Sequence, residues 1–172
     1  MMSKYHISKI LNNNVIICIN SNQEVILIGK GIGFNKKPGM VVDDNASIEK
    51  VYKLDQKQQQ EYYKSLVEIA DEEVLQAIIE SVNYITSTTY MKDDKQLVIA
   101  LTDHITFAYK RLKQNQIISN PFAMETKHLY SEAYDIATQV IQRLNEKLDV
   151  TFPDDEIGFI ALHIASNKED LP

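Results

Sequence analysis

The fold is decided by residues 5–37, which read YHISKILNNNVIICINSNQEVILIGKGIGFNKK. Two apolar runs in this stretch, residues 15–19 and 25–28, are rich in Ile and Val, and clusters of Asn, Ser and Gly separate them from their neighbours. β-Branched residues favour strands, whereas Asn and Gly favour turns. We therefore predict an antiparallel sheet in the N-terminal third, with strands at Tyr5–Leu11, Val15–Ile19, Glu24–Lys30 and Glu49–Leu54.

The apolar runs of this sheet are continuous rather than alternating, which indicates strands that are covered on both faces. A domain of about 55 residues has a small core, and the sequence indicates no second layer within it. We therefore expect the sheet to pack on its twin in a symmetric homodimer.

The rest of the chain has helical patterns. Residues 97–112 carry apolar side chains on one helical stripe, which predicts a long helix. Capping residues predict four more helices: one from Asp71 to about Ser87, one beginning at Asn120-Pro121, one after Ser131 to about Leu148, and one opened by Pro153. Five such helices without a strand pattern predict a bundle.

The expected fold class is α+β with two domains. A small, dimerising antiparallel sheet occupies residues 1–56, and an all-α helical bundle occupies residues 67–172. Residues 57–66 are polar and lack strong periodicity, so they are interpreted as a linker.

The charge is unevenly distributed between these parts. The chain of 172 residues holds 24 acidic and 18 basic residues, a balance that by itself disfavours nucleic acid as a partner. However, residues 1–56 hold seven lysines against five acidic residues, a net charge of +2, while residues 57–172 have a net charge of −8. The split predicts two parts with different partners.

Composition also bounds the compartment. Cys18 is the only cysteine, so no internal disulfide forms, and its apolar neighbours indicate a small buried side chain. No apolar run reaches the length of a membrane span, and the N-terminus does not resemble a signal peptide. We expect a cytoplasmic protein without membrane insertion.

Patterns typical of enzymes are missing from the sequence. It contains no Gly-x-Ser-x-Gly motif, no P-loop and no Cys-His signature. The segment Gly29-Lys30-Gly31-Ile32-Gly33 fits neither nucleotide-binding spacing, and its glycines fit a bulge at a strand end equally well. We expect no enzymatic activity, no cofactor and no metal site.

Two of the four histidines are candidates for chemistry. His104 and His163 each lie in the middle of a predicted helix at the border of its apolar stripe, where one ring nitrogen stays reachable. Imidazole titrates near neutral pH and is a competent nucleophile, so either residue is suited to accept a phosphoryl group. The alternative is a half-buried histidine that serves packing. His6 and His128 are interpreted as ordinary residues.

Polar residues of the predicted sheet form a second candidate site. Asn side chains pair with base edges, Gly permits close approach of backbone, and Lys meets phosphate. An ordinary polar turn explains the asparagines alone, and a solvated surface pair explains Lys36-Lys37 alone. Their occurrence together with Phe34 within 26 positions favours nucleic acid.

These motifs resemble the BglG/LicT/SacY family of bacterial transcriptional antiterminators over essentially the whole chain. Ile10-Leu11-Asn12-Asn13-Asn14-Val15, followed by Gly29-Lys30-Gly31-x-x-Phe34-x-Lys36-Lys37, resembles the co-antiterminator RNA-binding domain. Leu101-Thr102-Asp103-His104-Ile105, Glu125-Thr126 and the segment from Glu156 to Ile164 resemble the first PTS regulation domain. Residues 25–37 are most similar to glucose-type members.

The resemblance implies a regulator that binds, as a dimer, an RNA hairpin of a nascent leader transcript and prevents a terminator hairpin from forming. The residues implied to face RNA are Lys9, Asn12, Asn13, Asn14, Gly29, Lys30, Gly31, Phe34 and Lys36. PTS phosphotransfer proteins are implied to phosphorylate His104 and His163. Family members generally carry a second regulation domain, so the full regulation is not read from these residues.

Two rival functions remain. A phosphohistidine carrier would pass a phosphoryl group onward from His104 or His163, but it has no use for a basic sheet. A DNA-binding regulator with the same sensory domain would be expected to carry a helix-turn-helix, and the strand-rich N-terminal third has no such pattern.

Overall fold

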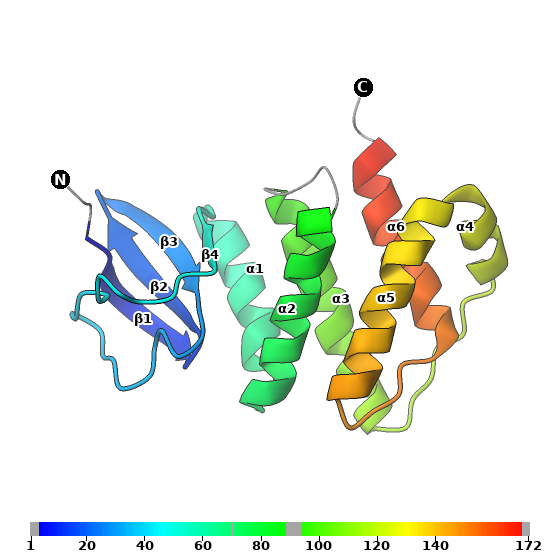
Figure 1. The fold of residues 1–172 in the computed structure, drawn as a ribbon, viewed down its shortest axis with the longest axis horizontal. Coiled ribbons are helices and arrows are strands. Elements are labelled where there is room, and N and C mark those ends of the chain that lie inside the picture. Colours follow the sequence, from blue (N-terminus) through cyan, green and yellow to red (C-terminus); the bar gives the residue numbers. More distant parts are fainter. Residues whose placement is uncertain (1–3, 70, 89–93, 170–172) are drawn as a thin grey trace. The chain divides into compact units, whose positions relative to one another are not determined.

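The computed structural model describes residues 4–69, 71–88 and 94–169. The chain divides into two compact units, residues 1–67 and residues 68–172. Among the described residues, the first holds an antiparallel sheet and one helix, and the second holds five helices (Figure 1). The α+β architecture predicted from the sequence is confirmed.

The sheet of the first unit has four strands in sequence order, β1 (His6–Asn12), β2 (Val15–Asn20), β3 (Gln23–Ile28) and β4 (Lys50–Tyr52). Each strand lies within about two residues of its predicted range. The β2–β3 hairpin turns at Ser21 and Asn22, which both have positive φ. Asparagine is among the residues that tolerate this conformation best.

Residues 57–66, expected to be a linker, are helical and belong to α1 (Gln56–Val67). Asp55 begins the helix in a reciprocal cap, because its carboxylate accepts from the Gln58 amide N–H while the Gln58 side chain accepts from the Asp55 N–H. Tyr62 and Leu66 are buried, four positions apart on one face. Only two large apolar residues hold this helix, so its periodicity is weak in the sequence.

The same chain covers both faces of the sheet, contrary to the expectation that it contains no second layer. On one face, Ile32 and Val42 from the β3–β4 connection join a core built on residues of β1, β2 and β3. On the other face, Ile26 pairs with Tyr52, whose ring packs edge-on against Tyr62 of α1 at 6.3 Å between centroids. Helix α1 lies beside the sheet (Figure 1). Burial of the strands therefore requires no second copy of the chain.

The second unit contains α2 (Glu72–Thr88), α3 (Lys95–Lys113), α4 (Ala123–Leu129), α5 (Ser131–Lys147) and α6 (Asp154–Glu169). Helix α5 packs against α2 and α6, and α3 packs against α2 and α6. As predicted, Asp71 caps α2, since its carboxylate accepts from the N–H groups of Glu73 and Val74. The bundle expected from the sequence is confirmed.

Helix α4 begins at Ala123, two residues after the predicted start at Pro121. Asn120 does act as a local cap, because its side-chain oxygen accepts from the Phe122 N–H. Its own N–H donates to the carboxylate of Asp155 at 3.0 Å, which ties this corner to α6. Gly158 permits the close approach, since a Cβ there would lie 2.6 Å from Nδ2 of Asn120.

Candidate functional site

The asparagine triplet forms the turn between β1 and β2, and the structure joins it to the glycine segment. The Asn12 side chain accepts from the Asn14 N–H at 2.7 Å, which stabilises the turn. The Asn14 side-chain oxygen accepts from the Gly31 N–H at 2.8 Å, and the Asn14 carbonyl accepts from the Gly29 N–H at 2.9 Å. The Asn13 carbonyl accepts from the Gly33 N–H. Two segments 17 residues apart thus become one rigid surface, here called the Asn–Gly loop pair (residues 12–14 and 29–34).

The glycines of this pair have different roles: Gly29 permits a close approach of backbone, and Gly31 adopts a turn conformation with positive φ. A Cβ on Gly29 would lie 1.9 Å from the Ser47 carbonyl oxygen, so no other residue fits there without a backbone shift. Gly31 has a φ of +71°, a conformation that favours glycine. Successive turns follow, in which Ile32 donates to the carbonyl of Gly29 and Phe34 donates to that of Gly31.

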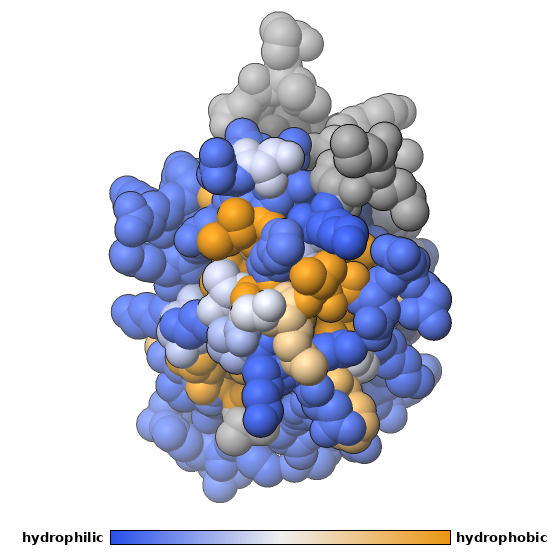
Figure 2. All heavy atoms as spheres, turned by 90° about the vertical axis from the view of Figure 1, so that its left-hand side faces the viewer, coloured by the Kyte–Doolittle hydropathy of each residue, from blue (hydrophilic) through white to orange (hydrophobic). Residues whose placement is uncertain are grey.

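The Asn–Gly loop pair presents a cation and an aromatic ring to solvent. Lys30 is exposed, and 59% of the Phe34 surface is accessible. The sheet-bearing side of Figure 1 is mostly hydrophilic with hydrophobic side chains among the polar ones (Figure 2). Such a mixture can contact phosphates through the ammonium group and unpaired bases through the ring.

Two of the lysines expected at this site lie in contacts within the first unit. The Lys9 Nζ lies 4.0 Å from the centre of the Tyr63 ring, on the face of the sheet that α1 covers. The Lys36 Nζ forms an ion pair with Asp43 at 2.8 Å. The structure thus brings Asn12, Asn14 and the glycines together but directs these two ammonium groups elsewhere.

Sequence reasoning missed Gly33 as a member of this site. A Cβ at Gly33 would lie 2.7 Å from the Asn12 carbonyl oxygen, so this glycine is also required for the two loops to meet. The repeated glycine spacing over residues 29–33 was the available signal.

The second candidate site lies between α3 and α6, where His104 and His163 meet. Their ring centroids are 5.1 Å apart, and both residues are partly exposed. Phe159 lies one turn before His163 and places its ring 5.8 Å from that of His104. The structure therefore brings together the two histidines that the sequence analysis selected, while His6 and His128 are exposed.

A carboxylate and a guanidinium that sequence reasoning missed complete this site. Glu156 binds His104 Nε2 through Oε2 at 2.8 Å and Arg111 Nη2 through Oε1 at 3.0 Å. The Glu156 side chain is only 4% exposed. A signal was present in the spacing, because His104 and Arg111 are seven residues apart on α3, and Glu156 and His163 are seven apart on α6. Seven residues are close to two helical turns, so each pair shares one helix face.

The pKa of His163 lies below its usual value of 6.5, because burial disfavours the charged ring and His104 adds to this effect, while Asp103 opposes it. Below pH 6.5 the unfolded chain therefore binds a proton at this position before the folded protein does, so stability falls as the pH decreases.

We expect urea unfolding of a His163→Asn variant to lose less stability between pH 7.5 and 5.5 than the parent protein loses. An exposed histidine offers the matched control, and His128→Asn should keep the parental pH dependence. Equal slopes for all three proteins would contradict the assignment of this effect to His163.

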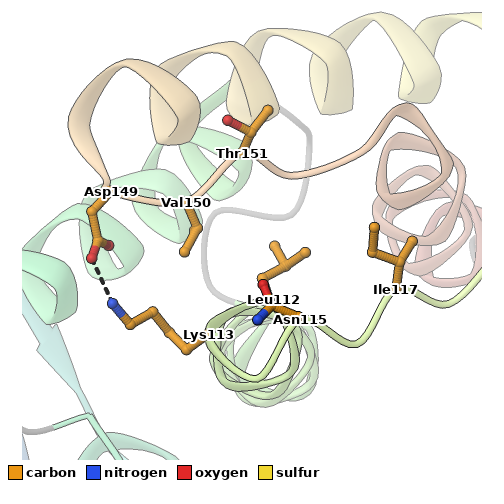
Figure 3. Close-up of a pocket in the computed structure, with 7 residues that line it drawn as sticks. All are labelled: Leu112, Lys113, Asn115, Ile117, Asp149, Val150 and Thr151. Atoms are coloured by element: carbon orange, nitrogen blue, oxygen red, sulfur yellow. Dashed lines mark hydrogen bonds and ion pairs between the residues drawn. The ribbon is translucent and has the colours of Figure 1, made fainter.

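The helical unit has a surface pocket of about 410 Å³ (Figure 3). It is formed by the C-terminal end of α3, the segment that follows α3 and the loop before α6, and neither His104 nor His163 lines it. Its two charged side chains, Lys113 and Asp149, are paired with each other at 2.7 Å. Asp149 also accepts from the Tyr109 hydroxyl, so these groups are used in joining α3 to the loop.

Three further features bear on function: the single thiol, possible metal ligands and possible membrane-spanning helices. Burial raises the pKa of the Cys18 thiol to about 11, which keeps it protonated, as expected for a small buried side chain. Among residues 4–69, 71–88 and 94–169, no group of three or more His, Cys, Asp or Glu side chains is arranged to hold a metal ion. A bilayer-spanning helix needs a long apolar run, and no helix in the part of the chain that the structure describes has one.

Comparison with protein families gives two matches that follow the two units. The CAT RNA binding domain matches residues 5–61, and the PRD domain matches residues 76–167. A solved structure described as "Crystal structure of GlcT CAT-PRDI" is similar, with a TM-score of 0.82 and 43% identity. The similarity covers 95% of this chain and 97% of that one.

Curated relatives named "Protein GlcT" are similar over nearly the whole chain. One from Staphylococcus haemolyticus (strain JCSC1435) is 81% identical over 170 residues, and one from Staphylococcus aureus (strain bovine RF122 / ET3-1) is 68% identical over 171 residues. In each case 99% of this chain is matched, and the chain spans about 60% of the relative's length. Because the PRD domain match alone covers more than half of the chain and the CAT match precedes it, the chain belongs to the BglG/LicT/SacY family of transcriptional antiterminators.

Proposed function

We propose that this protein is an RNA-binding transcriptional antiterminator and not an enzyme. Residues 1–56 bind a hairpin in a nascent leader transcript, which keeps the competing terminator hairpin from forming, and residues 67–172 regulate this binding. Because the target is a nascent transcript, the protein acts in the cytoplasm. The observation that carries the proposal is the Asn–Gly loop pair, in a region that matches a CAT RNA binding domain.

The RNA contacts follow from the chemistry of that surface. We assign base-edge hydrogen bonds to Asn12, Asn13 and Asn14, close backbone approach to Gly31, phosphate contact to Lys30, and base stacking to Phe34. Gly29 is buried against Ser47, so we assign it the role of supporting the loop that carries Lys30 and Gly31. Lys9 and Lys36 retain a supporting role in the proposal, because release from Tyr63 and Asp43 would free their ammonium groups for phosphate. A surface ion pair such as that of Lys36 with exposed Asp43 is weak and easily exchanged.

We also propose that the protein works as a homodimer through its sheet unit. Apolar side chains on this unit remain exposed, among them Met40 at 44% and Val41 at 37%. The segment that carries them pairs with β1, since Ile7 donates to the Met40 carbonyl. Sedimentation of the full chain tests this proposal, and a strictly monomeric protein at micromolar concentration would contradict it.

Regulation is assigned to phosphorylation of His104 and His163 by PTS phosphotransfer proteins. Each phosphoryl group adds close to two negative charges, and residues 57–172 already have a net charge of −8. Repulsion within a symmetric dimer would then change how the copies pack and lower the affinity for RNA. In a variant with both histidines replaced by Asp, unchanged hairpin binding together with unchanged dimerisation would count against this mechanism.

A gel-shift titration of the full chain against a leader-RNA hairpin and a duplex DNA tests the function. We expect the protein to bind the hairpin and not the duplex DNA. Binding to the hairpin should be lost or strongly weakened in Asn14→Ala and Lys30→Ala, and the control Lys147→Ala on α5 should bind as the parent protein does. Asn14→Ala removes the acceptor of the Gly31 N–H as well as an amide, whereas Lys30→Ala removes only charge.

The rival functions predict other outcomes. Binding to duplex DNA in preference to the hairpin would favour a DNA-binding regulator. Absence of binding to either nucleic acid at low salt, combined with phosphoryl transfer from His104 or His163 to another protein, would favour a phosphohistidine carrier.

A further inference from the structure

Glu156 uses both carboxylate oxygens on partners from another helix. Its Oε2 lies 2.8 Å from His104 Nε2, and its Oε1 lies 3.0 Å from Arg111 Nη2. All three side chains are largely withdrawn from solvent, with exposures of 4% for Glu156, 19% for His104 and 13% for Arg111. Hydrogen bonds to a carboxylate that is shielded from water are strong, so these two contacts fix the orientation of the His104 ring and of the Arg111 guanidinium.

The contact determines which ring nitrogen of His104 carries the proton. The Glu156 carboxylate pairs with the guanidinium of Arg111, and a carboxylate only accepts hydrogen bonds. His104 Nε2 must therefore be the donor. In a neutral imidazole the other nitrogen then has the free electron pair, so Nδ1 is the nucleophilic atom.

We propose that Glu156 is a positioning residue that presents Nδ1 of His104 as the atom that accepts the phosphoryl group, with Arg111 holding the carboxylate in place. This inference rests on the proposed function, because it deepens the assignment of His104 as a phosphorylation site.

The transfer step is balanced without any further reactant. The Nδ1 electron pair forms a bond to phosphorus of the donor protein's phosphorylated side chain, while the bond between phosphorus and the donor atom breaks and its electron pair returns to that atom. The proton on Nε2 stays in place, so the phosphorylated ring carries a positive charge. Glu156 faces that charge and stabilises it as it develops.

Transfer to Nε2 instead would require displacement of Glu156. The carboxylate lies 2.8 Å from Nε2 in the direction of its N–H bond, and a phosphoryl dianion there would face a buried negative charge. Both effects oppose modification at that nitrogen.

The tautomer can be measured on the unmodified full chain, which keeps this test independent of phosphorylation. Long-range ¹H–¹⁵N correlation spectra of ¹⁵N-histidine-labelled protein at pH 7.5 distinguish the two tautomers, and a His104→Gln variant assigns the resonances. We expect His104 to carry its proton on Nε2. A proton on Nδ1 would overturn the inference whatever becomes of the proposed function.

Phosphorylation by PTS phosphotransfer proteins that carry a phosphoryl group provides the second test. We expect ³¹P spectra of the His163→Asn variant to show phosphate on Nδ1 of His104. The rate of transfer to His104 should fall at least about tenfold in Glu156→Gln, which lacks the charge that fixes the tautomer. The control Glu80→Gln, from an exposed pair with Lys147, should keep the parental rate.

The outcomes separate the two proposals. Phosphate on Nε2, or an unchanged rate together with an unchanged tautomer in Glu156→Gln, would overturn the role of Glu156 while leaving the site assignment intact. Absence of phosphorylation at both histidines would contradict the proposed regulation, and the tautomer measurement would still decide whether Glu156 positions the ring.

Discussion

Replacing Glu156 with alanine is expected to lower the free energy of unfolding by about 3–5 kcal/mol, because it leaves a largely shielded guanidinium without its acceptor. The carboxylate is 4% exposed and Arg111 is 13% exposed, so water replaces the lost contact poorly. The same substitution removes the acceptor of the His104 ring N–H. Urea unfolding at pH 7.5 measures the effect.

A double-mutant cycle separates the lost contact from the cost of the charge that remains. In Glu156→Ala with Arg111→Met, the methionine carries no charge, and the double variant should recover part of the stability lost in Glu156→Ala. Glu80→Ala, which removes a carboxylate from an exposed ion pair with Lys147, should leave unfolding nearly unchanged. If Glu156→Ala were as mild as this control, the network would not be a stabilising element of the α3–α6 contact.

Replacing Phe34 with alanine is expected to weaken hairpin binding by about 1–3 kcal/mol, roughly five- to 150-fold, which is the effect of losing one base stacked on an aromatic ring. Phe34 is 59% exposed at the end of the Asn–Gly loop pair. An exposed ring contributes little to the core, so the free energy of unfolding should change much less than the affinity. Titration of the full chain with a leader hairpin at constant salt gives the ratio of dissociation constants.

The chain offers a matched control for this substitution. Phe122 is 65% exposed but belongs to the helical unit, so Phe122→Ala should bind the hairpin as the parent protein does. Equal losses in both variants would indicate a nonspecific effect on solubility or folding. An unchanged affinity in Phe34→Ala would remove stacking at this position from the proposed interface.

The strands and most helices could be predicted because each depends on a local signal. Continuous Ile and Val runs between turn residues indicated β2 and β3. Asp is a common capping residue, so Asp71 indicated the start of α2, and the structure shows its capping hydrogen bond to Glu73. Helix α1 was missed for the opposite reason. Its large buried apolar residues are limited to Tyr62 and Leu66, which is too few to give a clear helical periodicity. Tyr62 packs against Tyr52 of β4, and this contact forms only when the helix and the strand come together in the folded unit.

The burial of β2 and β3 could be inferred from the sequence, but the segments that bury them could not. The sequence indicated that both faces of β2 and β3 are covered, and the structure agrees. The cover comes from α1 and from the irregular connection that contributes Ile32 and Val42. An irregular segment carries no periodic pattern, so the sequence does not reveal which surface it will cover. The homodimer therefore stays a proposal with its own test.

The sequence alone indicated the order of a small sheet and a helical bundle, the unequal charge of the two parts, and the candidate residues for chemistry, namely the Asn turn, the glycine segment, His104 and His163. These features follow from local propensity and from side-chain chemistry, both of which act over a few neighbouring residues. The tertiary structure alone decided which of these groups meet. It joined Asn14 to Gly31 and directed Lys9 and Lys36 into other contacts. It also placed Glu156 between His104 and Arg111. Most of these contacts link residues 17 to 54 positions apart, so they arise only when whole elements pack together.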